Sequence, residues 1–414
     1  MNVWLITVGE SLPILGRNDR LLRTGLLAER LVQRGHDVLW WTSTVDHFRK
    51  QLIVSGEPRL PSSIGAELQF IRGQFYKKNV SLSRLKNHLE IAHRFRELSR
   101  AEEHPDVILC SFPTIELCRE AVLYGKEYRI PVVIDVRDLW PDIFLELFPS
   151  WIKYIGLLLL RKLFLDAKFA LANADAIYAV SKSYLAWGLK KAGRNATNRD
   201  KVFPLAYKPS LPTLEDSACL MGKLPDLEVS EAKPIIVFAG TFGQTYDLAT
   251  VLLGVRKMNL SNAYKPQFVF CGTGELHGEW KALASGLENV YFPGWLSVGE
   301  LAQLLAWADI GIAAYARGAP QGIPNKVIEY MSAGLPVLCS LPGEARILLE
   351  SSQCGLYYEA GNAESFATAL SGLLFSPSLR AEMGKKSKAI FECKFTSEMV
   401  YEDMIDELEL LTSG

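Results

Sequence analysis

Short apolar runs alternate with amphipathic segments through the first half of the chain. In the segment 19–35, Leu22, Leu26, Leu27 and Leu31 recur at helical spacing and predict one apolar helix face. The alternation of apolar runs with helices predicts a parallel, doubly wound α/β sheet. The strands are predicted at residues 3–9, 37–43, 106–112, 131–138 and 174–181, with a further helix from Ser181.

The pattern changes at residues 208–232, which contain three prolines, five acidic residues and little periodicity. We therefore expect a linker there. A second βα series follows, with strands predicted at 234–240, 266–272, 289–294, 309–315 and 335–340, and helices from Asn362 with a break near Pro377. The predicted organisation is two doubly wound, Rossmann-like domains facing across a cleft, with a C-terminal helix that crosses back to the first domain. The expected boundaries are 1–207, 208–232 (linker), 233–395 and 396–414 (C-terminal helix).

Composition narrows the class of protein. A chain of 414 residues favours two domains, and a net charge of −1 provides no field for binding nucleic acid. The seven cysteines form no CxxC pair, which predicts reduced thiols and a cytoplasmic location, and the first ten residues do not resemble a signal peptide. The apolar stretch from Trp151 is interrupted by charges, so it predicts no spanning helix.

Two glycine-rich turns follow predicted strands of the second half. The first spans Gly240, Thr241 and Gly243, and the second spans Gly272, Thr273 and Gly274. Backbone amides at such turns, with a helix dipole behind them, suit a phosphate. Neither turn has the spacing of a dinucleotide fingerprint or a P-loop. A purely structural tight turn is the alternative in each case.

The stretch 321–340 combines a Gly-Pro turn, a short helix and a strand. Pro324 suits the first position of a helix, and Lys326 would lie in its first turn, where the dipole disfavours a cation. An anion bound there would remove that penalty. Glu329, one turn further on and on the same side as Asn325, could accept hydrogen bonds from a sugar diol. The alternative is an exposed salt bridge between Lys326 and Glu329.

These blocks resemble the retaining family 4 glycosyltransferases of the GT-B fold. The resemblance rests on "GIPNKVIEYMSAGLPVLCS", "FAGTFG", "FCGTGEL", "ADAIYAVS", the N-terminal "VGESLP" block and "DVRDLWPD", and it covers nearly the whole chain. Bacterial enzymes that build O-antigen, capsule or exopolysaccharide (cell-surface lipopolysaccharide and related polymers) are the most similar. It implies a peripheral place on the cytoplasmic face of the inner membrane, for which the basic amphipathic segments 151–168 and 72–100 are candidates.

The resemblance also implies roles for individual residues. Glu329 would hold the ribose of a sugar nucleotide, and the 272–274 turn would border the nucleobase. The loop after the first strand would face the donor phosphates, and "DVRDLWP" would face sugar and acceptor. The donor-binding candidates are Gly9, Glu10, Gly240, Thr241, Gly243, Gly272, Thr273, Gly274, Arg317, Gly322, Ile323, Pro324, Asn325, Lys326 and Glu329; the catalytic candidates are Asp138, Arg137 and Gln321.

Three departures from the family pattern affect these roles. Gln321 stands where the family has a first glutamate that touches the donor sugar, and Arg137 stands where a histidine is common. The Arg and Lys that usually neutralise the diphosphate correspond to Thr241 and Tyr246. The cation must then come from elsewhere, with Lys326 the first candidate and Arg317 the second.

The predicted activity is transfer of a sugar from a nucleoside diphosphate sugar, with UDP favoured, to a saccharide acceptor that is free or linked to polyprenyl diphosphate. Retention of configuration, no cofactor and no metal are expected, since no DxD motif is evident. Nucleic acid is not an expected partner. A sugar-nucleotide epimerase and a non-catalytic scaffold of polysaccharide assembly are the alternatives.

Overall fold

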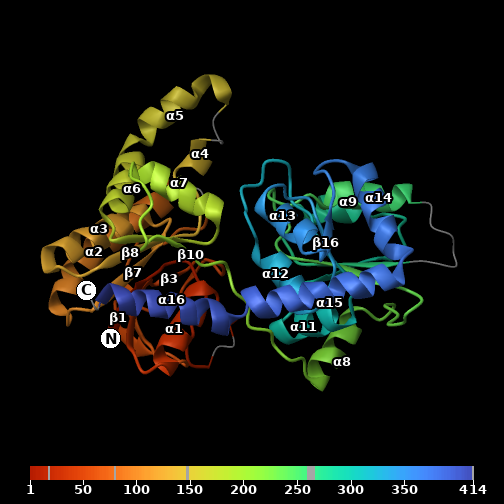
Figure 1. Ribbon diagram of the computed structural model, residues 1–414, viewed down its shortest axis with the longest axis horizontal. Coiled ribbons are helices and arrows are strands. Elements are labelled where there is room, and N and C mark those ends of the chain that lie inside the picture. Colours follow the sequence, from red (N-terminus) through yellow and green to blue (C-terminus); the bar gives the residue numbers. More distant parts are fainter. Residues whose placement is uncertain (17–18, 79–80, 146–148, 259–265, 413–414) are drawn as a thin grey trace. The chain divides into compact units, whose positions relative to one another are not determined.

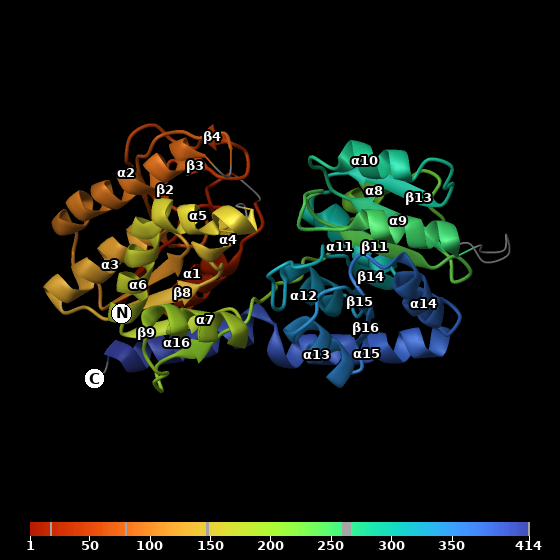
Figure 2. The same cartoon turned by 90° about the horizontal axis from the view of Figure 1, so that it is seen from above.

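The computed structural model describes residues 1–16, 19–78, 81–145, 149–258 and 266–412. The chain divides into two compact units, Met1–Pro204 with Ser397–Gly414, and Leu205–Thr396 (Figures 1 and 2). Each unit is a parallel sheet with helices on both faces, as the sequence pattern predicts. None of the helices in the described part of the chain combines the length and apolarity that spanning a bilayer requires.

The sheet of the first unit has the strand order β10-β9-β8-β7-β1-β2-β6-β5. All of its neighbours pair in parallel except the short edge strand β5, which is antiparallel to β6. A small antiparallel pair, β3-β4, follows β2. The strands are β1 Asn2–Ile6, β2 Asp37–Ser43, β3 Val45–Asp46, β4 Gln51–Leu52, β5 Arg59–Pro61, β6 Glu67–Ile71, β7 Val107–Phe112, β8 Val132–Val136, β9 Ala176–Ala179 and β10 Lys201–Val202.

Helices α2, α3, α6 and α7 cover one face of this sheet, and α1 and α16 cover the other (Figure 1). This is the arrangement that right-handed crossovers impose when strand order reverses at β1. The helices are α1 Arg23–Gln33, α2 Leu82–Leu98, η1 Ser99–Ala101, α3 Ile115–Tyr128, α4 Asp142–Leu145, η2 Ser150–Ile152, α5 Lys153–Leu159, α6 Arg161–Asn173, α7 Lys182–Ala192 and α16 Ser397–Thr412.

The second unit has a fully parallel sheet in the order β13-β12-β11-β14-β15-β16. Its strands are β11 Ile235–Ala239, β12 Gln267–Cys271, β13 Val290–Gly294, β14 Ile310–Ala313, β15 Val337–Cys339 and β16 Gly355–Tyr357. Its helices are α8 Leu214–Lys223, α9 Leu248–Lys257, α10 His277–Leu283, α11 Val298–Trp307, α12 Asn325–Ser332, α13 Glu344–Ser351, α14 Ala363–Leu374 and α15 Pro377–Lys394.

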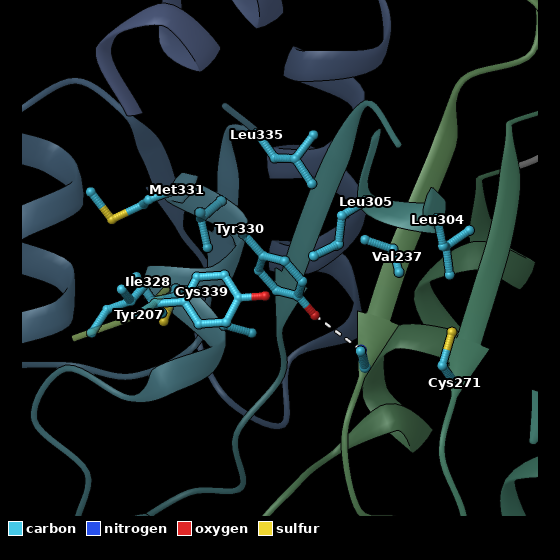
Figure 3. Packing of buried hydrophobic residues seen from close by; sticks show 14 of the residues in the cluster. Tyr207, Val237, Cys271, Leu304, Leu305, Ile328, Tyr330, Met331, Leu335 and Cys339 are labelled. Atoms are coloured by element: carbon cyan, nitrogen blue, oxygen red, sulfur yellow. Dashed lines mark hydrogen bonds between the residues drawn. The ribbon is translucent and has the colours of Figure 1, made fainter. Parts of the chain in front are cut away.

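The continuous apolar runs of the second unit arise because both faces of the sheet are covered. Along β11, Ile236 and Phe238 enter a core shared with α9 and α14, whereas Val237 and Ala239 enter a core shared with α8, α11 and α12. Figure 3 shows the second of these cores, where the Tyr330 ring of α12 reaches the sheet. The two-residue alternation therefore divides one strand between two cores.

The last helix, α16, belongs to the first unit and lies against α1. Its buried face carries Val400, Tyr401, Met404, Ile405 and Leu408. Acidic residues beside that face pair with basic residues of the first unit: Glu402 with Arg30 and Arg34, Asp406 and Glu409 with Arg34, and Glu407 with Lys201. Exposed pairs of this kind contribute little individually, so the apolar face is the main source of the attachment.

Three details differ from the sequence analysis. Residues 208–232, expected as a linker, lie in the second unit and contain α8, because Thr213 and Asp216 form a capping box and Leu220 and Leu224 pack into the core. Six strands fall in segments for which no strand was predicted, namely β3, β4, β5, β6, β10 and β16. Pro324 caps α12 rather than occupying its first turn.

Candidate active site

The two glycine-rich turns lie against each other at the carboxyl ends of β11 and β12. The Gly240 amide donates to the Cys271 carbonyl at 2.9 Å, and the Phe242 amide donates to the Thr273 carbonyl at 2.9 Å. A Cβ on Gly272 would lie 1.8 Å from the Gly240 carbonyl oxygen. Glycine is therefore required for the two backbones to approach this closely.

Helix α12 is fixed at the same edge of the sheet by Tyr330. The Ala239 amide, the last of β11, donates to the Tyr330 hydroxyl oxygen at 3.0 Å (Figure 3). Gly311 in β14 makes room for that ring, because a Cβ there would lie 2.4 Å from it. The start of α12 is thus held beside the Gly240 turn, with the positive end of its helix dipole at the same place.

The side chain of Lys326 lies inside this arrangement and is 5% exposed. Its Nζ lies 4.0 Å from the centre of the Phe238 ring and 4.8 Å from the centre of the Tyr246 ring. A Cβ on Gly240 would lie 2.5 Å from the same nitrogen. Within the described part of the chain, this ammonium makes no hydrogen bond and no ion pair. A charge held against two ring faces retains part of its stabilisation but none of its donors is satisfied.

Burial lowers the pKa of the Lys326 ammonium to about 8, although the charge of Glu329 acts in the opposite direction. The alternative of an exposed Lys326–Glu329 salt bridge does not describe the structure, because both side chains are buried. Burial likewise raises the pKa of Tyr246. The ammonium is therefore largely removed from water, and an anion beside it would interact strongly with it.

Of the remaining candidates in the second unit, those from Gln321 to Glu329 lie in or just before α12, whereas Arg317 lies apart from them. Glu329 is 6% exposed on the second turn of α12, and the Oε1 atom of Gln321 is buried without a hydrogen-bond partner in the described chain. Asn325 is exposed in the first turn of α12, and Gly322 and Ile323 lie in the preceding loop. Arg317 instead points to the 359–361 turn, where its guanidinium contacts Glu359 and Ala360.

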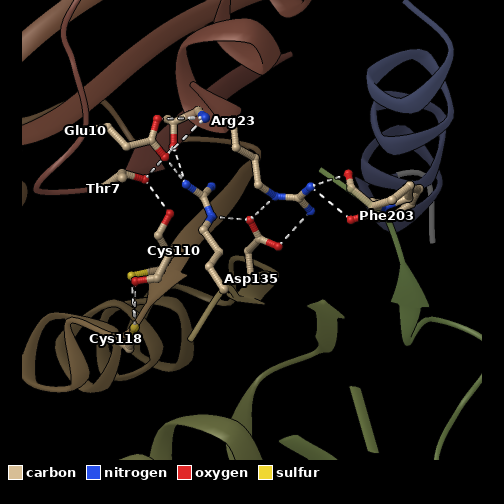
Figure 4. A network of polar contacts seen from close by, with 11 residues as sticks. Thr7, Glu10, Arg23, Cys110, Cys118, Asp135 and Phe203 are labelled. Atoms are coloured by element: carbon tan, nitrogen blue, oxygen red, sulfur yellow. Dashed lines mark hydrogen bonds and ion pairs between the residues drawn. The ribbon is translucent and has the colours of Figure 1, made fainter. Parts of the chain in front are cut away.

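In the first unit, Arg137 belongs to a buried polar network (Figure 4). Arg23 donates to both oxygens of Asp135 at 2.8 and 2.9 Å, and Arg137 donates to one of them at 2.7 Å. Arg137 also contacts Glu10 and Thr24. Burial opposes ionisation of Asp135, but the charges of Arg23 and Arg137 outweigh it and lower the pKa of Asp135 to about 2.

This network determines what the first-unit candidates can do. Glu10 accepts hydrogen bonds from the amide and hydroxyl of Thr24, so it holds the start of α1. Among the residues that the structure describes, the Nη2 atom of Arg137 has no hydrogen-bond partner. Asp138 lies just beyond the network, accepts from the Leu139 amide at 2.8 Å, and has its pKa raised by burial. Roles of Gly9, Glu10, Arg137 and Asp138 toward a substrate remain predictions.

Sequence reasoning missed several residues that the fold brings to these edges. His277, the single histidine after residue 104, stacks on Phe242 beside the Gly274 turn and has a buried Nδ1 without a partner in the described chain. In the first unit, His47, Tyr76 and Arg84 come together from separate segments. The position of His277 directly after a glycine-rich turn was a usable signal, whereas the second group has no signal in local sequence.

Both halves of the chain match known family models. Residues 24–198 match "Glycosyltransferase Family 4", and residues 233–375 match "Glycosyl transferases group 1". The chain is therefore a glycosyltransferase that combines a domain of each of these two families. Its two Rossmann-like units constitute the GT-B fold, which agrees with the prediction from sequence.

Solved GT-B structures align with this glycosyltransferase along its whole length. Sucrose-phosphate synthase from Thermosynechococcus elongatus has a TM-score of 0.73 at 16% identity, covering 100% of this chain and 99% of its own. WaaG, a glycosyltransferase involved in lipopolysaccharide biosynthesis, has a TM-score of 0.65 at 14% identity and covers 100% of both chains. HepE from Anabaena, solved with UDP-glucose, has a TM-score of 0.65 at 16% identity and covers 99% of both.

A curated relative of this glycosyltransferase is similar over part of the chain. It is the GDP-mannose-dependent monoacylated alpha-(1-6)-phosphatidylinositol monomannoside mannosyltransferase of Corynebacterium glutamicum, 28% identical over 148 residues. The alignment covers 34% of this chain and 39% of the relative.

The Asp135 network predicts a large effect on stability. Asp135→Asn leaves the buried guanidinium of Arg23 without its counter-charge and removes one of the two acids that pair with Arg137. We expect the free energy of unfolding at pH 7 to fall by about 3–5 kcal/mol. Urea denaturation followed by circular dichroism measures this, with Asp37→Asn at an exposed position as the control. Because the pKa of Asp135 is lowered, the difference from wild type should shrink as pH falls from about 4 to 2. An equal effect of both variants would contradict this assignment.

A substitution at Lys326 should have the opposite effect on stability. Lys326→Met removes a buried charge and keeps the volume, so the melting temperature at pH 6 should rise by roughly 5 °C. Since folding lowers the pKa of Lys326 to about 8, wild type becomes relatively more stable as pH rises from about 8 to 10.5, and the advantage of the variant should vanish there. Differential scanning calorimetry measures both effects, with exposed Lys281→Met as the control. Destabilisation of Lys326→Met at pH 6 would show that the charge stabilises the fold.

Proposed function

We propose that this glycosyltransferase moves a sugar from a nucleoside diphosphate sugar, with UDP-sugar the favoured donor, to a lipid-linked saccharide during synthesis of a bacterial cell-surface polysaccharide. The observation that carries the donor class is the Lys326 ammonium, which is buried beside the Gly240 turn and the start of α12 with no hydrogen bond in the described chain. A diphosphate is the ligand that would satisfy this cation and the positive end of the α12 dipole together.

The donor diphosphate would lie against Gly240, Thr241 and Gly243, with the ammonium of Lys326 beneath it. Glu329 would accept hydrogen bonds from the ribose hydroxyls, and Gln321 would bind a hydroxyl of the donor sugar through its unpartnered Oε1 atom. The nucleobase would border Gly272, Thr273 and Gly274, close to His277. The UDP-glucose complex of HepE supports UDP, while the GDP-mannose-dependent relative supports GDP.

Lys326 would compensate for the cations that other family members carry after the first strand of this unit. Tyr246 stands where a lysine is usual, and the structure places the Lys326 nitrogen 4.8 Å from the centre of its ring. The same region thereby receives a positive charge from α12. Arg317, the second candidate for this cation, contacts Glu359 instead.

The proposed reaction breaks the bond between C1 of the sugar and the β-phosphate oxygen, and the electron pair moves to the leaving diphosphate. Lys326 and the positive end of the α12 dipole would stabilise this charge more strongly in the transition state than in the bound donor. The acceptor oxygen would bond to C1 on the same face, with its proton passing to the departing phosphate oxygen, which gives retention. Asp138 would orient the acceptor. Because Lys326 supplies the charge, we propose that the step needs no metal.

The acceptor would be presented at a membrane surface, where polyprenyl diphosphate saccharides lie. Helix α5 stands out from the body of the first unit in Figure 1. Trp151, Tyr154, Leu158 and Leu159 are 82%, 84%, 71% and 70% exposed. An apolar surface of this extent is unusual for a monomer in water. Lys153, Arg161 and Lys162 flank it, and residues 149–165 contain no acid. An anionic bilayer matches both features.

The first experiment tests donor binding. Thermal-shift measurements with UDP, GDP, ADP and dTDP should reveal one stabilising nucleotide, because binding to the folded state raises its melting temperature. Lys326→Gln should raise the Kd for that nucleotide at least tenfold, whereas Arg317→Gln should change this Kd by less than twofold. Nucleotide binding to wild type should weaken as pH rises through about 8, because the Lys326 ammonium of the unliganded protein loses its proton there. Nucleotide binding to Lys326→Gln should not show this pH dependence.

The same measurements separate the alternatives. Absence of a shift with every nucleotide would favour a non-catalytic scaffold. Conversion of a bound UDP-sugar to its epimer without acceptor would identify an epimerase, whereas a transferase only hydrolyses the donor slowly. Nucleotide binding that is unaffected by Lys326→Gln would remove the central element of the proposal.

The second experiment tests membrane contact. Wild type should float with vesicles that contain phosphatidylglycerol and much less with pure phosphatidylcholine. Combined Trp151→Ser, Tyr154→Ser and Leu158→Ser should reduce flotation at least tenfold, because they remove the inserted apolar area. Leu211→Ser with Leu214→Ser is the matched control, since these leucines are 91% and 92% exposed in the second unit. Equal loss of flotation in both variants, or no flotation of wild type, would contradict membrane contact through this surface.

A further inference from the structure

A cluster of aromatic and basic side chains lies beyond the carboxyl ends of β2, β6 and β8 in the first unit. We call it the Arg84 cluster, and it consists of His47, Lys50, Tyr76, Arg84 and Trp140. The Tyr76 hydroxyl and the His47 Nδ1 atom are 2.9 Å apart. The guanidinium carbon of Arg84 lies 4.7 Å from the centre of the Trp140 ring and 5.8 Å from that of Tyr76.

The cluster gathers positive charge in a partly buried place. Lys50 Nζ lies 5.2 Å from the centre of the Tyr76 ring, so it shares that ring with Arg84. Burial, followed by the charges of Arg84 and Lys50, lowers the pKa of His47 to about 4. Burial, followed by the charge of Arg84, also lowers the pKa of Lys50. The fold therefore holds Lys50 and Arg84 close together although their positive charges repel each other.

The surrounding elements add to this field. Arg84 lies in the first turn of α2, a helix of 17 residues with no acid in that turn, so the positive end of its dipole points to the cluster. Lys77 and Lys78 precede the helix and are exposed. Among the described acids whose charges act on Lys50 and Arg84, Asp46 pairs with Arg49, and burial raises the pKa of Asp138. Within this described set of side chains, positive charge exceeds negative charge.

We infer that the Arg84 cluster is an oxyanion subsite of the first unit that takes a phosphate of the acceptor. Lys50 and the edge of the Arg84 guanidinium would donate to the phosphate oxygens, because planar and ammonium donors suit this group. Tyr76 and Trp140 hold the guanidinium plane. Trp140 is not a platform for a sugar ring, because Arg84 covers the ring on one side and His88 stacks on it at 5.9 Å.

This inference rests on the proposed function for its substrate, since a saccharide on a polyprenyl diphosphate carries its charge next to the first sugar. The subsite lies beside Asp138, whose pKa the charge of Arg84 influences. A phosphate bound there would anchor the acceptor while Asp138 orients its sugar. The donor diphosphate is assigned to the second unit, so the two anions have separate sites within the same enzyme.

Titration calorimetry of the full chain with inorganic pyrophosphate tests the subsite. In the presence of saturating UDP, which fills the donor site, wild type should still bind pyrophosphate. Arg84→Gln and Lys50→Gln should each weaken this binding at least tenfold. Lys86→Gln, an exposed residue on the same helix, is the matched control and should leave the Kd unchanged. Lys326→Gln should lose UDP binding and keep pyrophosphate binding, which separates this inference from the donor site.

Two further measurements identify the ligand class and exclude a purely structural role. Glucuronate, which carries a carboxylate, should bind at least tenfold more weakly than pyrophosphate; tighter binding would overturn the phosphate assignment. Arg84→Gln should raise KM for a lipid diphosphate acceptor and leave KM for a neutral alkyl glycoside of the same saccharide unchanged. If pyrophosphate competes with UDP for one site, or if neither variant alters its binding, the inference is wrong. Should Arg84→Gln fail to fold, Lys50→Gln decides the question.

Discussion

The second unit is organised around one desolvated ammonium group. Lys326 is 5% exposed and lies against the faces of Phe238 and Tyr246, without a hydrogen bond in the described chain. The absence of a Cβ at Gly240 leaves the space for its Nζ atom. The hydrogen bond from the Ala239 amide to Tyr330 fixes the helix that carries it. Each of these features restricts which residue can occupy its position, and together they hold a buried cation at the start of α12.

The two units treat buried charge in opposite ways. In the first unit, Asp135 is surrounded by Arg23 and Arg137, and Arg23 also donates to two backbone carbonyls. Such a network is nearly complete, so it holds segments together and has little capacity for a ligand. In the second unit, Lys326 has aromatic rings in place of acceptors. A buried charge without acceptors lowers the stability of the folded state, and proteins retain such destabilising groups mainly at functional sites.

Features of the fold that depend on a local sequence pattern could be predicted from the sequence alone. Apolar runs located most strands, and the glycines at 240, 272 and 274 marked turns that the structure shows in direct backbone contact. It failed where the decisive partner is distant. Helix α8 was taken for linker because of the neighbouring prolines, whereas Leu220 and Leu224 pack into a core built from distant segments. The Arg84 cluster joins residues 47, 76, 84 and 140, which share no local pattern.

The departures from the family pattern are best understood together. A tyrosine at position 246 removes a cation from the turn after β11, but its ring also offers a negative face to a cation arriving from another element. Lys326 on α12 arrives at that face, and Glu329 three residues later is near enough for its charge to favour the ammonium. A second lysine at 246 would instead place two positive charges within the same buried space. Tyr246 and Lys326 therefore act together in physical terms, because the ring of one faces the charge of the other.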